Sequence, residues 1–205
     1  MDIISLIFFF LVITFSAVIH EYSHGWMADR LGDPTARLAG RLTLNPIAHI
    51  DPFGTFLLPA LLFLGTGGRM LFAYAKPVPV NPYNLKNSRY GSAYVAIAGP
   101  ASNIILAFVF GMMVRVFPDS VLTPFWAIIV FSNVLLAVFN LVPIPPLDGS
   151  KVLFSILPSQ FNNFKVFLEA YGWMFLLFFI FFFFQMLIPV IQFFFTLFAG
   201  QAVLP

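Results

Sequence analysis

Residues 3–24 read IISLIFFFLVITFSAVIHEYSH, a long apolar run that ends in His20-Glu21-Tyr22-Ser23-His24. An apolar run of this length is typical of a membrane-spanning helix. Residues four apart lie on one face of a helix, so the two imidazoles can converge on one cation while Glu21 stands beside them. The stretch therefore predicts a metal site carried by a helix inside a membrane.

The residue types in this pattern suit hydrolysis. Neutral imidazoles are good zinc ligands, and a bound zinc ion lowers the pKa of a water molecule toward neutrality. Glu21 is placed to take the proton of that water and to deliver it to a leaving amine. The alternative is that these side chains serve packing alone. Ionisable groups at the end of a membrane helix are costly and usually functional, and the chain has only three His and two Glu, which favours the metal site.

The composition of the 205 residues is that of a membrane protein. Hydrophobic residues make up 60% and charged residues 9%, which leaves too little polar surface for a soluble globule. We expect one integral membrane domain, residues 1–205. Asp2 stands where a signal peptide would carry basic residues, so the first helix is expected to stay in the mature protein. The net charge of +2 argues against a nucleic-acid partner, and the absence of cysteine excludes thiol chemistry.

The apolar runs predict an all-α polytopic membrane protein with about four full transmembrane helices. Residues 53–64 are apolar but short for a span, and Pro59 interrupts them, so we expect a re-entrant element there. Residues 151–171 are mixed in character and are expected at the membrane interface. The predicted spans are residues 3–31 with Gly32 as the stop signal, residues 93–117, residues 125–141, and the Phe-rich residues 173–198 with a kink at Pro189.

Two polar segments are predicted to be extended and to lie near the metal site. Residues 35–44 alternate partly between apolar and polar side chains, which favours a short β-hairpin, although a solvated loop would fit as well. Residues 76–82 contain three prolines, which exclude a regular helix. An edge strand at residues 35–44 or 71–80 would hold an unwound peptide by backbone hydrogen bonds.

A third metal ligand has to come from elsewhere in the chain. Asp148 follows the proline-rich break after residues 125–141, and a catalytic zinc site takes three protein ligands and leaves one position open. The alternative is that Asp148 only caps the next helix. For Asp148 to reach the two histidines, the first helix and residues 125–141 must run in the same direction. One full crossing, residues 93–117, then lies between them, and residues 53–64 do not cross.

The same topology places most basic residues on one side of the membrane. By the positive-inside rule that side is cytoplasmic, which puts the metal site near the cytoplasmic face and the N-terminus outside. At ~1.5 Å per residue, His20 lies about 26 Å from Ile3, just inside the far edge of a ~30 Å hydrocarbon layer. Arg115 is on the opposite side, and Arg69 is ambiguous. The side of the metal site holds Arg30, Arg37, Arg41, Lys76, Lys86, Arg89, Lys151 and Lys165.

Several ordered motifs beyond the first pentapeptide resemble the site-2 protease family of intramembrane zinc metalloproteases. The resemblance covers residues 17–152 and is with the compact branch, because no stretch is long or polar enough for a PDZ domain or a CBS pair. Regulation through such domains is therefore not carried over. The motifs are HEYSH at 20–24, GRLTLNP at 40–46, DPFGT at 51–55, KPVPVNP at 76–82, GPASN at 99–103 and NLVPIPPLDG at 140–149.

The resemblance implies a role for each matched residue. His20, His24 and Asp148 would bind one Zn²⁺ ion, and Glu21 would be the general base and acid. Asn140 would position the substrate or stabilise the oxyanion, for which a neutral amide in a dry site is suited. The alternative for Asn140 is that it only braces the helix break. The expected substrate contacts are Leu42, Val78 and Asn140.

The resemblance also implies the substrate and the partners. The substrate would be a membrane-spanning segment of another protein, which must unwind because the peptide bonds of a helix are already hydrogen-bonded. The setting would be the lipid bilayer of a prokaryotic cytoplasmic membrane, with a regulatory membrane partner or a homo-oligomer as further partners. The rival classes are a membrane metal transporter or sensor that uses the same ligands, and an inactive homologue that serves as a substrate-binding scaffold. The filled catalytic positions favour a protease that performs regulated intramembrane proteolysis.

Overall fold

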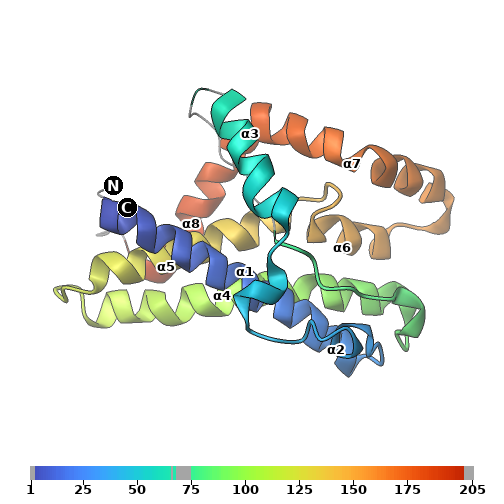
Figure 1. Cartoon of the computed structure of the whole chain (residues 1–205), viewed down its shortest axis with the longest axis horizontal. Helices are drawn as coiled ribbons and strands as arrows, with labels where there is room; N and C mark the ends of the chain where they lie inside the picture. Colours follow the sequence, from blue (N-terminus) through green and yellow to red (C-terminus); the bar gives the residue numbers. More distant parts are fainter. Residues whose placement is uncertain (1–2, 66, 68–74, 201–205) are drawn as a thin grey trace.

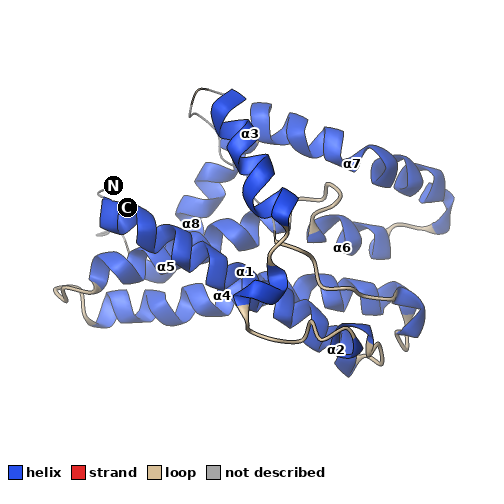
Figure 2. Ribbon diagram, in the orientation of Figure 1, coloured by secondary structure: helices blue, strands red, loops and turns tan. Residues whose placement is uncertain are grey.

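The computed structural model describes residues 3–65, 67 and 75–200, and the regular structure of these residues is entirely helical (Figures 1 and 2). Four helices are long and apolar enough to cross a membrane, which confirms the predicted number of spans and identifies an integral membrane protein. The candidate spans are Ile3–Arg30 (α1), Tyr90–Val116 within α4 (Ser88–Val116), Thr123–Asn140 (α5) and Ser159–Phe182, which contains α7 (Asn162–Phe182).

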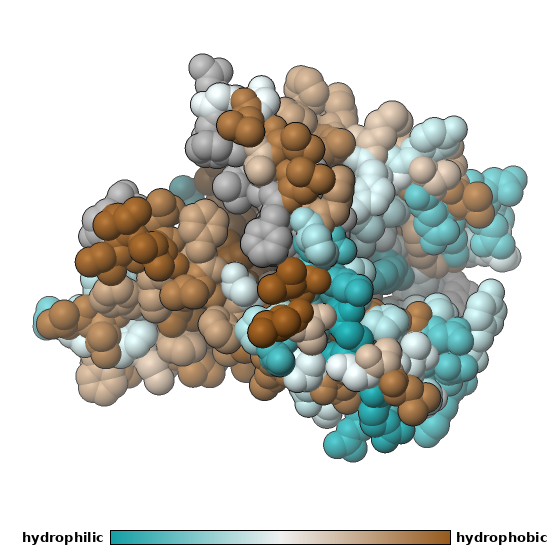
Figure 3. Space-filling model, in the orientation of Figure 1, coloured by the Kyte–Doolittle hydropathy of each residue, from teal (hydrophilic) through white to brown (hydrophobic). Residues whose placement is uncertain are grey.

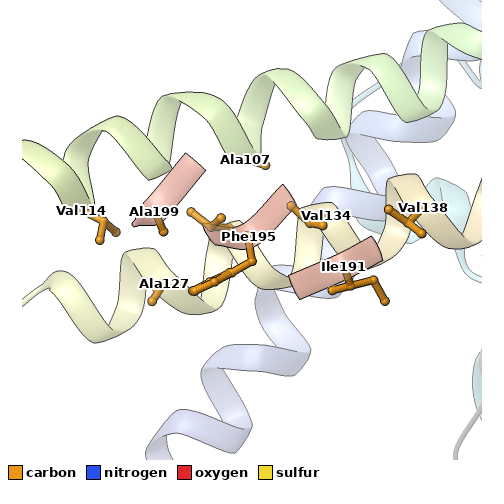
Figure 4. Packing of buried hydrophobic residues seen from close by; sticks show 9 residues of the cluster. Ala107, Val114, Ala127, Val134, Val138, Ile191, Phe195 and Ala199 are labelled. Carbon is orange, nitrogen blue, oxygen red and sulfur yellow. The ribbon is translucent and has the colours of Figure 1, made fainter. Parts of the chain in front are cut away.

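The centre of the molecule is a bundle of α1, α4 and α5. Helices α1 and α5 run in the same direction and α4 runs in the opposite one, so one full crossing separates the first helix from α5, as predicted (Figure 1). Helix α8 (Ile188–Ala199) packs across α4 and α5 through a buried apolar cluster that includes Ala107, Val134 and Phe195 (Figure 4). Lipid is as apolar as these side chains, so the hydrophobic effect does not drive the helices together within a membrane. Close van der Waals packing between the helices stabilises the bundle instead.

Helix α1 ends where the sequence predicts, because Gly32 adopts a φ of 106°, which L side chains rarely adopt. Buried Asp33 then ties the chain after α1 to the loop before α4. Its carboxylate accepts hydrogen bonds from the Asn81 N–H at 2.6 Å, from the Asn84 side chain at 2.9 Å and from the Thr35 hydroxyl. Burial raises the pKa of Asp33, but these hydrogen bonds outweigh it and lower the pKa below its ordinary value.

The predicted β-hairpin at residues 35–44 is wrong. Thr35–Leu38 form a short helix (α2), and the chain that follows has no regular structure up to residue 44. The backbone of this segment makes local turns, such as the hydrogen bond of 2.9 Å from the Arg41 N–H to the Ala36 carbonyl. A weak alternation over so few residues does not outweigh these local hydrogen bonds.

The chain between α2 and α4 is irregular apart from short helices. Pro52–Leu57 forms a π-helical turn (η2) that continues into α3 (Leu58–Gly65), and the pair is not among the candidate spans, as expected for residues 53–64. Its re-entry into the membrane stays a prediction. Residues 75–81 have no regular structure, and residues 71–74 of the predicted strand lie outside the described residues. Two 3₁₀ turns are η1 (Pro46–His49) and η3 (Pro82–Asn84).

The C-terminal part is divided differently from the prediction. A single span at residues 173–198 is wrong, because a 3₁₀ segment, Phe184–Leu187 (η5), separates α7 from α8. Pro189 does not kink a continuous helix but stands in the first turn of α8, where its missing N–H is tolerated. The sequence predicts the membrane interface for residues 151–171, but residues 159–171 belong to the candidate span Ser159–Phe182. The chain before them folds as α6 (Asp148–Ile156) and η4 (Ser159–Phe161).

Helix α7 meets the chain before α6 through a close backbone contact. A Cβ atom at Gly172 would lie 2.6 Å from both the Cβ and the O atom of Pro145. One turn further along α7, buried Leu176 packs in a cluster with Val142 and Leu147. Gly172 therefore sets how closely α7 approaches the segment that leads to Asp148.

Replacing Gly172 by valine is expected to push α7 away from Pro145 and to lower the free energy of unfolding by about 1–3 kcal/mol, as overpacking does in other proteins. Thermal unfolding of the purified protein in detergent measures the effect. Ala170→Val is the matched control, because Ala170 is exposed on the same helix. An equal loss of stability in both variants would contradict the packing role of Gly172.

Candidate metal centre

His20 and His24 lie one turn apart on α1, and both are buried. Their Nε2 atoms are 3.0 Å apart. Asp148, the first residue of α6, places its Oδ2 atom 3.0 Å from His20 Nε2 and 3.1 Å from His24 Nε2. Lys151 donates to the other carboxylate oxygen of Asp148 at 3.3 Å. The structure thus brings the three predicted ligands together, because α5 runs parallel to α1 and delivers the chain to Asp148 at the same end (Figure 1).

The three ligand atoms form a triangle that fits one zinc ion. Ligands of a tetrahedral zinc, at ~2.0–2.1 Å from the metal, lie about 3.4 Å from one another, and the observed edges are slightly shorter. Gly99 of α4 faces this triangle. A Cβ atom at Gly99 would lie 2.5 Å from His24 Nε2 and 2.6 Å from His20 Nε2. Only a residue without a side chain leaves room for an ion beside both imidazoles.

Glu21 stands next to the triangle but is held apart from it. A carboxylate oxygen of Glu21 and one nitrogen of each imidazole lie within 4.8 Å of one another, so His20, Glu21 and His24 are an alternative ligand set. However, Oε2 of Glu21 accepts a hydrogen bond from the Val78 backbone N–H at 2.8 Å. Asp148 contacts both Nε2 atoms directly, which favours Asp148 over Glu21 as the third ligand.

The segment that holds Glu21 is itself braced by the preceding loop. Nε2 of buried His49 lies 2.9 Å from the Thr43 carbonyl oxygen. Because a carbonyl oxygen can only accept, His49 Nε2 donates this hydrogen bond. The Lys76 N–H donates to the His49 carbonyl at 2.8 Å, and the Arg41 guanidinium donates to the Lys76 carbonyl at 2.8 Å. The loop after α2 therefore fixes the position of the chain that covers Glu21.

A cavity of about 630 Å³ opens beside the triangle and is lined by Glu21, Asn140 and the three ligands. Its lining also includes Phe154 of α6 and the charged Lys165 and Glu169 of α7. Sequence analysis missed these wall residues, because a lysine and a glutamate four apart on a helix are most often a solvated pair. The cavity makes α7 part of the site.

Asn140 is the last residue of α5 and takes part in two features of the site. It lines the cavity, and its Nδ2 donates to the Leu136 carbonyl at 2.9 Å, which uses one of its two amide hydrogens. The hydrogen bond matches the bracing role, while the position in the cavity wall leaves the predicted substrate role open to test.

Val78 and Leu42, the other expected substrate contacts, are placed differently. Val78 lines the cavity, whereas Leu42 is not among the described residues of its wall. Both side chains pack against α1, because a Cβ atom at Gly25 would lie 3.0 Å from Val78 Cγ1 and 3.3 Å from Leu42 Cδ1. Contact of Leu42 with a substrate therefore stays a prediction that nothing in the cavity supports.

These features define a class of protein. A helix with the His-Glu-x-x-His pattern, an aspartate from a distant helix and a set of apolar spans are the parts of a membrane-embedded, zinc-dependent hydrolase. The chain belongs to peptidase family M50, the site-2 protease family, whose profile matches residues 8–120 and 115–184. The family predicted from the motifs is thereby confirmed.

Three relatives carry the name "Putative zinc metalloprotease". The chain is 39% identical over 175 residues to YwhC of Bacillus subtilis, and the aligned region covers 80% of this chain and 76% of YwhC. It is 32% identical over 141 residues to Rip2 of Mycolicibacterium smegmatis (65% of this chain, 51% of the relative) and 47% identical over 60 residues to MJ0611 of Methanocaldococcus jannaschii (29% and 31%). No solved structure matches the chain. The family and these names imply a zinc ion.

Replacing Gly99 by alanine is expected to abolish zinc binding, because the new methyl group would occupy the space between the two Nε2 atoms. At an ordinary helix position the same change stabilises a protein by about 1 kcal/mol. Metal analysis of the purified protein measures the bound zinc, and circular dichroism checks the helix content. Gly65→Ala, with open space around its new Cβ, is the control. A full zinc content in Gly99→Ala would contradict the proposed cradle.

Proposed function

We propose that this protein is an intramembrane zinc metalloprotease. It hydrolyses peptide bonds within or near transmembrane segments of other membrane proteins and so performs regulated intramembrane proteolysis. The observation that carries the proposal is a fixed carboxylate, Glu21, beside the triangle of His20, His24 and Asp148 in a cavity between apolar helices. A transporter or a sensor needs the three ligands but has no use for a fourth, separately held carboxylate.

Each side chain has one task in this mechanism. His20, His24 and Asp148 would hold a zinc ion, which would act as a Lewis acid toward a water molecule and the peptide carbonyl. Glu21 takes the proton of the attacking water and returns it to the leaving amine, a form of catalysis that contributes ~10²–10⁴-fold. The Val78 N–H holds Oε2 of Glu21 at 2.8 Å and so leaves Oε1 for the proton.

The substrate enters the cavity as an unwound segment. A peptide bond inside a membrane helix is internally hydrogen-bonded, so it is shielded until that part of the helix opens. The irregular chain at residues 77–80 lines the cavity beside Glu21, and Asn140 lines it at the end of α5. We infer that the unwound segment lies between these two walls, with its carbonyl oxygen toward the Asn140 amide. Substrate helices with weakening Gly or Pro residues fit this requirement best.

The proposal includes an orientation and partners. Hydrophilic residues gather over the end of the molecule that holds α2 and α6, whereas the end that holds the N-terminus is mainly hydrophobic (Figure 3). We place the polar end, with the metal centre, near the cytoplasmic face of a prokaryotic membrane and the N-terminus outside. The exposed aromatic side chains of α7, such as Phe167, Trp173 and Phe178, would contact lipid, a regulatory membrane protein or a second copy of the chain.

Replacing Glu21 by glutamine is expected to leave zinc binding intact and to lower the rate of cleavage by ~10²–10⁴-fold, because the amide cannot accept the proton of water. The measurement is cleavage of a panel of single-span membrane proteins by the zinc-loaded wild type and variant. A chelator should abolish the wild-type activity. Asp119→Asn, in the exposed loop at the other end of the bundle, is the control.

Two outcomes would count against this proposal. Cleavage by Glu21→Gln at the wild-type rate would remove Glu21 from the reaction. A wild type that binds zinc, cuts no member of the panel and moves zinc across vesicles would favour a transporter instead.

Replacing Asn140 by alanine separates its two roles. A donor to the developing oxyanion would lower kcat by ~10²–10³-fold with unchanged zinc content. A bracing residue alone would lower the midpoint of thermal unfolding and change kcat only a few-fold. Single-turnover cleavage assays and thermal unfolding, made on the same preparations, decide between the two.

A further inference from the structure

A chain of buried polar side chains connects His20 to the middle of the helical bundle. His20 Nδ1 lies 2.6 Å from Asn103 Oδ1 of α4, and Asn103 Nδ2 lies 2.9 Å from Asn133 Oδ1 of α5. Asn133 Nδ2 donates to the Ser16 hydroxyl of α1 at 3.0 Å. Asn103 and Asn133 are 0% exposed. The mechanism above does not use these amides, and burying them among apolar helices is costly unless they are hydrogen-bonded.

Two backbone carbonyls fix which group donates in each hydrogen bond between these buried side chains. Asn133 Nδ2 lies 2.9 Å from the Ile129 carbonyl, which can only accept, so the NH₂ end of Asn133 is there and its oxygen faces Asn103. Asn103 Nδ2 therefore donates to Asn133, and it also donates to the Ser16 carbonyl at 3.4 Å. The oxygen of Asn103 is left to face His20, which must be the donor.

The direction of these bonds decides which nitrogen of His20 is free. Because Nδ1 carries the proton that is donated to Asn103, Nε2 keeps its lone pair for a cation, and it lies 3.0 Å from Asp148 Oδ2 and 3.0 Å from His24 Nε2. His24 is fixed in the same form, since its Nδ1 lies 2.7 Å from the Val95 carbonyl, which can only accept. The tautomer of His24 is thus set by a backbone carbonyl, whereas the tautomer of His20 is set by the side chain of Asn103.

We propose that Asn103, oriented by Asn133, is a positioning residue that holds the His20 ring in the tautomer and rotation in which Nε2 binds the metal. The inference rests on the proposed metal centre. Partners of this kind, when removed, typically lower metal affinity or activity by ~10–100-fold. Without the acceptor, nothing keeps the proton on Nδ1, and the form protonated on Nε2 cannot bind the metal through that atom.

Nitrogen NMR of the metal-free protein tests the tautomer without relying on activity. The full chain, labelled with ¹⁵N-histidine in detergent micelles at alkaline pH, has only three imidazoles to assign. We expect the wild type to show His20 protonated on Nδ1, and Asn103→Leu to show a population protonated on Nε2. An unchanged His20 spectrum in Asn103→Leu would overturn the proposal.

Zinc affinity of the same preparations gives the second measurement. We expect a loss of ~10–100-fold in Asn103→Leu. Asn103→Asp keeps an acceptor for His20 but buries a charge, so it should bind zinc more tightly than Asn103→Leu although it unfolds more easily. A merely structural role predicts instead that affinity follows stability, and that result would overturn the proposal.

Two further variants complete the design. Asn133→Leu removes the group that orients Asn103, and Asn133 does not touch His20. We expect this variant to lose zinc affinity as well, but by less than Asn103→Leu. It serves as the test if Asn103→Leu fails to fold. Ser132→Ala is the matched control, because the buried Ser132 hydroxyl has no hydrogen-bond partner in the described part of the chain. Equal zinc affinity in Asn133→Leu and Ser132→Ala would overturn the orienting role of Asn133. A wild type that binds no zinc would overturn the metal centre itself.

Discussion

The structure depends on bringing three polar side chains to one point among apolar helices. His20, His24 and Asp148 are each buried, and a buried ionisable group is tolerated only when partners satisfy it. Two helices of the same direction are needed to place Asp148 beside the histidines, and a third helix must return the chain between them. That third helix, α4, passes the ligands at Gly99, because any larger residue would fill the space between the imidazoles. The order and the directions of the central helices follow from this one convergence.

Helix α1 directs the two histidines and Glu21 to different sides. Successive residues of an α-helix point about 100° apart, so Glu21 cannot share the face on which His20 and His24 stack. The Val78 N–H fixes the carboxylate in its own direction, and the loop that carries Val78 is tied to α1 through Asp33 and to the preceding loop through His49. These loops lie at the end of the molecule where hydrophilic residues gather (Figure 3). Their irregular shape is thus part of the site and not a by-product of short connections.

Sequence reasoning succeeds here where local geometry is enough. The spacing of the two histidines predicts that they share one face of α1, and Gly32 predicts the end of α1. The requirement that Asp148 reach the histidines predicts the common direction of α1 and α5. It fails where one pattern fits two structures. Residues 35–44 alternate too briefly to outweigh local turns. Residues 173–198 are apolar on both sides of η5, and the single polar residue Gln185 within η5 is too weak a signal to predict a break in the helix. The bonds of Asn103 join residues far apart in the chain, and no local pattern encodes them.

Two environments meet at His20. One edge of its ring faces the cavity, whose lining includes the charged side chains of Lys151, Lys165 and Glu169. The other edge faces Asn103 in the closed interior of the bundle, where no water competes and an amide hydrogen bond is strong enough to orient the ring. A motif in the middle of α1 would lack access to the cavity, and one beyond the bundle would lack the buried amide. The placement of the histidines near the polar end of α1 meets both requirements, since His20 lies between the cavity and the buried amide of Asn103.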